Sequence, residues 1–190
     1  MDPSPPPGDA ERWCDLMKRY QQGDLEAFEE LYGCTLPMIR GYLGALTRDR
    51  ARTADLAQES YLQVHRSRHT YDPSQPLRPW LLGIARHVWL TDRRRRGRRL
   101  AREVAGLDPL PDLPVPPEAV LGLVVRDALM QALALLPPDR REAIVLHHLY
   151  GLSFHEVGRV VGVSEGGARI RASRALAELR AMLGERGPRG

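Results

Sequence analysis

A proline-rich segment divides the chain and limits the folds available to it. Residues 107–117 read LDPLPDLPVPP, with five prolines in eleven residues. Because proline fixes φ and lacks a backbone donor, such a segment forms an extended, semi-rigid spacer. The sequence on either side has the apolar periodicity of helices, with few β-branched alternations. We therefore predict an all-α protein: two small helical domains joined by a proline-rich linker, the second containing a helix-turn-helix.

The boundaries of these parts follow from composition. We expect a disordered tail at residues 1–9, a helical domain at 10–102, the linker at 103–119, a second helical domain at 120–184 and a tail at 185–190. Of the 190 residues, 43% are hydrophobic but only 6% are aromatic, so aliphatic helices should supply the cores.

Local signals place the helices of the first domain. Asp24 is expected to cap one helix, and Pro37 to mark a boundary or a kink in it. Thr53 precedes the next helix. Residues 70–79 contain three prolines and are expected to form a loop before a helix that begins near Leu77 to Trp80.

The second domain carries the signals of a helix-turn-helix. A helix over residues 118–136 is followed by another over 141–149, which Gly151 ends. Ser153 and Glu156 form a capping box for a short helix, and Gly162 supplies the tight turn after it. Ser164 caps a last helix whose core-facing stripe is Ala168, Ala172, Ala175 and Leu179. In this motif the second helix enters the major groove of DNA.

The other side of the last helix carries residues that can contact DNA. Gly166, Ile170 and Ser173 lie opposite the buried stripe, and three arginines flank it: Arg169, Arg171 and Arg174. A guanidinium group can bind guanine in a bidentate way or contact a phosphate, and an exposed isoleucine can contact a thymine methyl. The alternative is an amphipathic helix whose arginines are only solvated.

A second basic feature is WLTDRRRRGRRLAR, residues 89–102, where seven arginines follow the single acid Asp92. The net charge is only +4, so an anionic partner has to be met by local clustering. The run continues an apolar helical pattern, so we interpret it as the basic end of a helix, frayed or ended at Gly97. We expect the run to bind DNA phosphates. The arginines expected to make these contacts are Arg93, Arg94, Arg95, Arg96, Arg98 and Arg99.

Arginine usage can also reflect base composition. Lys18 is the only lysine among 28 cations. Guanidinium groups suit phosphates and base edges, but the abundance of Ala, Gly, Pro and Leu is equally typical of a GC-rich genome.

Other classes of protein are disfavoured. The N-terminus lacks a secretory signal, and no apolar run approaches the ~20 residues that cross a membrane, so we expect a cytoplasmic protein. No nucleotide loop or nucleophile motif is present, so we predict neither an enzyme nor a cofactor. His65 and His69 have a spacing that can bind zinc, but no nearby third ligand is evident, and we interpret them as surface residues without a metal. A sensor role for Cys14 or Cys34 stays open.

Three segments together resemble a known family. DLAQESYLQVHR (residues 55–66) resembles a helix of sigma factor region 2, and PWLLGIARHVWLTDRRRR (residues 79–96) resembles the segment that follows it. Residues 136–180 are similar to sigma factor region 4. Because both halves occur in the family's order and spacing, the chain is identified as a member of the extracytoplasmic-function (ECF) sigma factors, which keep only regions 2 and 4.

The resemblance implies partners and site residues. Core RNA polymerase would bind Asp55, Gln58, Glu59 and Leu62. The melted −10 promoter element would be held through Tyr71, Arg78, Trp80, Arg86 and His87, since flipped bases need a pocket and stacking surfaces. The duplex −35 element would be read through Ser164, Arg169, Ile170, Arg171, Ser173 and Arg174. Members of this class are usually held by an anti-sigma factor, which is a further expected partner.

Two departures from the family pattern bear on DNA recognition. His87 stands where the family usually has asparagine, and Gly166-Gly167-Ala168 stands where it usually has Gly-Thr-Val. We expect the second departure to loosen the recognition helix. Two alternative functions remain: a sigma-like decoy that binds an anti-sigma factor without initiating transcription, and a simple helix-turn-helix transcriptional regulator.

Overall fold

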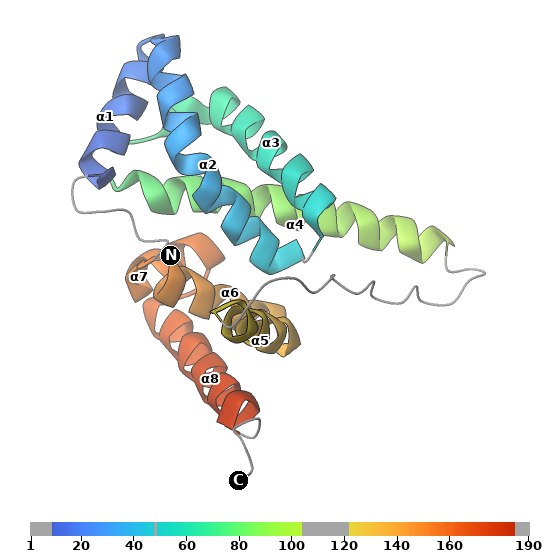
Figure 1. Cartoon of the computed structure of the whole chain (residues 1–190). Helices are drawn as coiled ribbons and strands as arrows, with labels where there is room; N and C mark the ends of the chain where they lie inside the picture. The colour runs from blue at the N-terminus through green and yellow to red at the C-terminus, as the bar shows by residue number, and fades with distance from the viewer. Residues whose placement is uncertain (1–8, 48, 104–121, 185–190) are drawn as a thin grey trace.

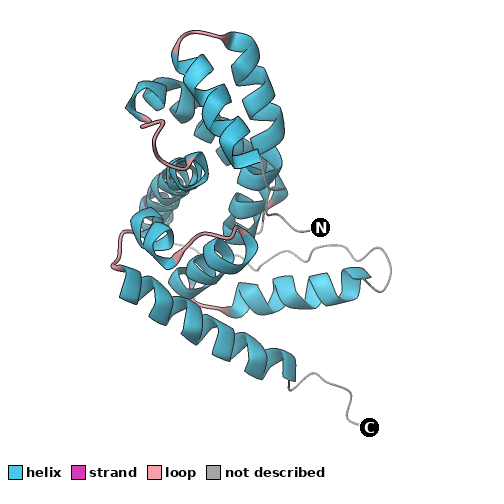
Figure 2. Cartoon of the chain, turned by 90° about the vertical axis from the view of Figure 1, so that its left-hand side faces the viewer, coloured by secondary structure: helices cyan, strands magenta, loops and turns pink. Residues whose placement is uncertain are grey.

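All regular structure in the described part of the chain is helical, and no described residue lies in a strand (Figure 2). The structure is a computed structural model that describes residues 9–47, 49–103 and 122–184, with side chains over narrower ranges. The all-α prediction is confirmed. The predicted tails and linker lie outside the described residues, apart from Asp9, which begins the first helix, and Glu103, which is the last residue of the fourth α-helix.

The N-terminal half is a bundle of four long helices (Figure 1). They are α1 (Asp9–Gln21), α2 (Leu25–Thr47), α3 (Arg50–Ser67) and α4 (Leu77–Glu103), with a 3₁₀ turn, η1 (Arg68–Thr70), after α3. Asp24 caps α2 as predicted, since its carboxylate accepts the Ala27 N–H at 3.0 Å. The cap of α3 is Asp49, which accepts the Arg52 N–H at 3.0 Å, so this helix begins earlier than Thr53.

Two predicted helix ends, at Pro37 and at Gly97, are wrong, and the alternative of a kink at Pro37 stays a prediction. Pro37 lies inside α2, where the buried Met38 and Ile39 keep the following turn packed on the core. Gly97 lies inside α4, because a glycine costs a helix only about 1 kcal/mol. As a result α4 is a single helix of 27 residues, and its basic end projects beyond the bundle (Figure 1).

The C-terminal half is built from shorter helices. They are α5 (Gly122–Leu135), α6 (Pro138–Ile144), α7 (Phe154–Val161) and α8 (Glu165–Gly184), with a π-helical turn, η2 (Val145–Leu149), after α6. The predicted helix at 141–149 is therefore an α-helix that widens into a π-helical turn. Residues 118–121 of the helix predicted at 118–136 lie outside the described residues.

Apolar side chains from both halves form one continuous buried cluster. In the N-terminal half it includes Met17, Leu31, Leu43 and Leu82, and in the C-terminal half it includes the predicted stripe of α8: Ala168, Ala172, Ala175 and Leu179. Helix α4 packs against α7, and α2 contacts α5 and α6. The two helical halves thus lie against each other rather than apart.

Candidate nucleic-acid and polymerase interfaces

The residues expected to bind polymerase form one exposed stripe on α3. Asp55, Gln58, Glu59 and Leu62 are all exposed, and Leu62 keeps 47% of its surface accessible. Their spacing of three and four residues puts them on one side of the helix, while the opposite side is buried in the bundle. The stripe is acidic and carries one apolar side chain, which suits a basic partner surface with an apolar contact.

The aromatic residues expected near melted DNA differ in accessibility. Trp80 is partly exposed, and His87 is exposed. Tyr71 is only 3% exposed, and its hydroxyl donates to the Gln75 carbonyl at 2.5 Å. Its ring supports Trp80, with ring centroids 5.3 Å apart. The expectation that Tyr71 offers an open stacking surface is therefore wrong in this structure, because α1 and the following loop cover it.

The two arginines of this set contact the C-terminal half. The Arg86 Nε donates to the Glu142 carboxylate at 2.7 Å, and an Arg78 guanidinium nitrogen donates to the Tyr150 carbonyl at 2.5 Å. The paired residues are 56 and 72 positions apart in sequence. Sequence reasoning placed both arginines toward DNA and gave no signal of these intramolecular partners.

A groove of about 810 Å³ lies between the halves at this place. Its N-terminal wall contains Trp80 and His87, and its C-terminal wall contains His155 and Arg159 of α7. The groove also includes Gln63, which sequence reasoning missed because it lies on the inner edge of the α3 pattern. The surface expected to hold melted DNA is thus faced by α7.

The arginine run of α4 is exposed from Arg93 to Arg98. Arg93 stacks over the Trp89 ring, 5.0 Å from its centroid. The side chain of Arg99, the last member of the predicted set, lies outside the described side chains. The run gives α4 an exposed, strongly positive end, which suits a polyanion.

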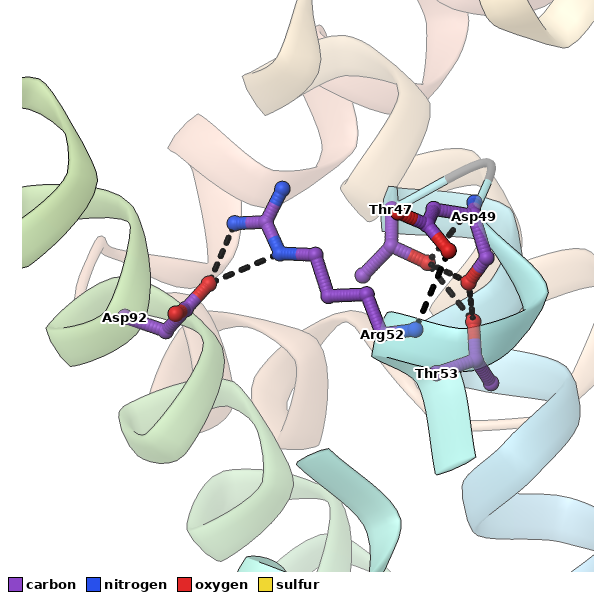
Figure 3. A network of polar contacts seen from close by, with 5 residues as sticks. All are labelled: Thr47, Asp49, Arg52, Thr53 and Asp92. Carbon is purple, nitrogen blue, oxygen red and sulfur yellow. Dashed lines mark hydrogen bonds and ion pairs between the residues drawn. The ribbon is translucent and has the colours of Figure 1, made fainter. Parts of the chain in front are cut away.

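Asp92 does not neutralise this run, because it is bound by Arg52 (Figure 3). The Arg52 Nε donates to the Asp92 carboxylate at 2.8 Å, and a second guanidinium nitrogen contacts the same oxygen. Arg52 lies in the first turn of α3, beside a bond of 2.7 Å between the hydroxyls of Thr47 and Thr53. The ion pair therefore joins α4, just before its basic end, to the start of α3.

The helix-turn-helix has the predicted geometry. Ser153 and Glu156 form the capping box of α7, and Gly162 has the left-handed φ of +74° that ends it. Sequence reasoning missed Gly158. A Cβ there would lie 2.7 Å from the Val163 carbonyl oxygen, so glycine is needed where the turn crosses α7.

The recognition helix α8 exposes most of the residues expected to face DNA. Ser164 caps it by accepting the Gly167 N–H at 3.1 Å. Ile170 is 54% exposed, and Ser173 and Arg174 are exposed. Arg169 lies 2.8 Å from Glu165 and stacks over the Phe154 ring, so its guanidinium is already oriented.

Arg171 differs from the other arginines of α8. It is only partly exposed, and its Nε lies 3.7 Å from the Asp139 carboxylate of α6. The Arg171 side chain is therefore directed toward α6.

His65, His147 and Cys14 have partners within the chain. The His65 Nδ1 lies 2.5 Å from the Tyr20 hydroxyl, and His147 stacks on Phe154 with ring centroids 3.9 Å apart. In the described part of the chain, no group of three or more His, Cys, Asp or Glu could hold a metal ion. Cys14 accepts a contact of 3.3 Å from the Tyr71 hydroxyl.

Comparisons with known proteins agree with this arrangement. Residues 31–99 match the model of sigma-70 region 2, and residues 126–179 match that of sigma-70 region 4. The RNA polymerase sigma factor CarQ of Myxococcus xanthus is 37% identical over 172 residues, which cover 89% of this chain and 96% of CarQ. The ECF RNA polymerase sigma factor SigF of Caulobacter vibrioides is 32% identical, over 86% of this chain and 89% of SigF. The chain belongs to the ECF sigma factors.

Solved structures share the sigma factor fold. The sigma factor RpoE of Bartonella quintana, solved in complex with the anti-sigma factor NepR, is 24% identical and covers 84% of this chain and 98% of its own, with a TM-score of 0.71. CnrH, solved with the cytosolic domain of CnrY, is 21% identical and covers 93% of this sigma factor and 99% of its own chain, with a TM-score of 0.68. Within the described ranges, no helix of this sigma factor has both the length and the apolar character to cross a membrane.

Proposed function

We propose that this sigma factor binds core RNA polymerase, recognises −10 and −35 promoter elements and promotes DNA melting at the start of transcription. The observation that carries the proposal is that one chain holds an exposed acidic stripe, an exposed arginine run and an exposed recognition helix. A decoy that only binds an anti-sigma factor does not need the two basic surfaces. A simple helix-turn-helix regulator does not need the stripe on α3.

Each surface has a proposed role. Asp55, Gln58, Glu59 and Leu62 contact polymerase. Trp80 and His87 face the melted −10 strand, and Arg78 and Arg86 reach it once they leave their partners in the C-terminal half. The exposed arginines of α4 hold phosphates without reading sequence, and Ile170, Ser173 and Arg174 read base edges of the −35 duplex beside the phosphate contacts of Ser164 and Arg169.

The protein acts as a specificity subunit in the cytoplasm, not as an enzyme, and an anti-sigma factor regulates it. Support for the regulator comes from the two solved sigma factors, RpoE and CnrH, whose structures contain NepR and the cytosolic domain of CnrY. The domain boundaries at 10–102 and 120–184 belong to the same proposal.

Run-off transcription with purified core polymerase tests this function. We expect defined transcripts from promoters of the source genome only when both the chain and core polymerase are present. Binding to duplex DNA without any stimulation of polymerase would indicate the regulator. Binding to an anti-sigma factor without any transcript would indicate the decoy.

A further inference from the structure

An aromatic ring at the start of α7 is covered by side chains from two other elements. Phe154, the first residue of α7, stacks on His147 with ring centroids 3.9 Å apart and an angle of 25° between the rings. The Arg169 guanidinium of α8 lies over the same ring, 5.3 Å from its centroid. Because an imidazole stacked so closely covers one face of the ring, the guanidinium takes the other face. The three side chains therefore form one stack across η2, α7 and α8.

The inner side chain of this stack is fixed to the backbone. His147 lies in the π-helical turn η2, and its Nδ1 lies 2.7 Å from the Leu152 carbonyl oxygen. A carbonyl oxygen can only accept, so Nδ1 carries a proton and donates it. Leu152 is buried and directly precedes Ser153, the cap of α7. The imidazole is thus held at the turn from which Phe154 begins, and π-helical turns are frequent at functional sites.

The outer side chain of the stack lies on the proposed DNA-binding side of α8. The Arg169 side chain keeps 63% of its surface accessible, and one of its guanidinium nitrogens donates to Glu165 at 2.8 Å. A guanidinium has several N–H donors in a planar fork, so this bond leaves others for a DNA phosphate. The ring attracts the cation through its π face, and the carboxylate attracts it from the side. Arg169 is therefore held in place while part of its donor edge stays accessible.

The start of α8 is weak as a helix, which gives this contact a purpose. Gly166 and Gly167 lie in its first turn, and glycine disfavours a helix because its backbone has more freedom to lose. The contact of Arg169 with Phe154 ties this part of α8 to α7. An arginine that is already ordered loses less conformational entropy when it binds a phosphate.

We infer that Phe154 and His147 are positioning residues for −35 recognition, which form an aromatic platform that orients Arg169 toward the DNA backbone. The inference rests on the proposed function of α8 and adds two residues from outside the recognition helix to it. The platform itself makes no contact with DNA. Its effect on the affinity for DNA therefore passes through Arg169.

A double-mutant cycle in the full-length chain tests the platform. Phe154→Leu removes the ring but keeps an apolar side chain, and Arg169→Ala removes the group that the ring orients. The matched control is Phe28→Leu, because Phe28 is the other phenylalanine of the chain, is partly exposed and stacks on Tyr20 with ring centroids 4.6 Å apart. The readout is the anisotropy of a fluorescein-labelled duplex that carries the −35 element of a promoter mapped by run-off transcription.

We expect Phe154→Leu to weaken binding of this duplex by about fivefold, and Arg169→Ala to weaken it by at least as much. The double variant should bind no more weakly than Arg169→Ala alone, because the platform acts through Arg169. Phe154→Tyr, which keeps the ring, and Phe28→Leu should bind as the wild type does. Additive losses in the double variant would overturn the inference, as would a Phe154→Tyr variant that binds as weakly as Phe154→Leu.

The stack itself can be checked without DNA. The ring current of Phe154 should move the NMR signals of the Arg169 side-chain protons upfield, and Phe154→Leu should abolish this shift. Ordinary Arg169 signals in the wild type would contradict the platform. Circular dichroism checks that each variant remains helical, and a cycle of His147→Ala with Arg169→Ala serves if Phe154→Leu does not fold. Failure of the proposed function has a different signature, since the Arg169 shift is then present while the wild type gives no run-off transcript.

Discussion

Two faces of the N-terminal half differ in what covers them. The stripe from Asp55 to Leu62 on α3 is exposed. Arg78 and Arg86 instead contact the C-terminal half, and α7 faces the groove that contains Trp80. The surface proposed for polymerase is accessible in this arrangement, and the surface proposed for melted DNA is not.

Reversing the charge of the exposed stripe should have the largest effect. We expect Asp55→Arg combined with Glu59→Arg to weaken binding to core polymerase by more than about tenfold, because like charges across an interface cost several kcal/mol. Affinity is measured by anisotropy with labelled sigma factor. Glu26→Arg with Glu29→Arg, two exposed acids on α2, is the matched control. If the α3 variant binds as the control does, the polymerase surface lies elsewhere.

The arginine run of α4 allows a test of whether an exposed surface binds DNA without preference for its base sequence. Replacing Arg93 to Arg96 by alanine should lower open-complex formation on every promoter. The slope of log affinity against log salt should fall by about 3, at about 0.7 for each of four single-strand phosphates. The measurement is a salt titration of open-complex formation, with exposed Arg40→Ala as the control. A change in promoter preference would mean that the run reads bases.

The two kinds of surface also differ in how far the sequence predicts them. The capping box of Ser153 and Glu156 and the turn at Gly162 depend on residues a few positions apart, so local signals predict them. The stripe on α3 is implied by the resemblance of its helix to sigma factor region 2. The covered face depends on pairs such as Arg86 with Glu142, 56 positions apart. Neither the sequence around Arg86 nor the sequence around Glu142 contains a signal that specifies this pairing.

Burial explains the error at Tyr71 in the same way. Tyr71 looks like a loop aromatic, but a cysteine of α1, a loop carbonyl and Trp80 surround it. Pro37 costs α2 about 3 kcal/mol, which the packing of the buried side chains of α2 offsets, and Gly97 costs α4 only about 1 kcal/mol.

The covered face can be tested through Trp80. We expect Trp80→Ala to reduce promoter opening by about tenfold, since stacking of one base on an aromatic ring contributes about 1–3 kcal/mol. Opening is followed by the fluorescence of 2-aminopurine in the −10 element. Binding of duplex −35 DNA should stay unchanged, and Trp80→Phe should restore part of the opening. An equal loss in both assays would mean that the substitution damages the fold.

The smallest expected effect concerns α8, whose proposed DNA-binding side is exposed like the α3 stripe. A Cβ at Gly166 meets nothing within 4 Å, so Gly166→Ala should stabilise the chain by about 0.5 kcal/mol and raise the melting temperature by about 1–2 °C. The matched change Gly158→Ala should lower the melting temperature, because its Cβ would press on the backbone of the turn. If the first turn of α8 is loose, Gly166→Ala should also tighten binding of −35 duplex DNA by a few-fold. Stabilisation without a gain in affinity would show that this exposed face is already ordered in the free protein, as the Ser164 cap and the Arg169–Glu165 pair favour.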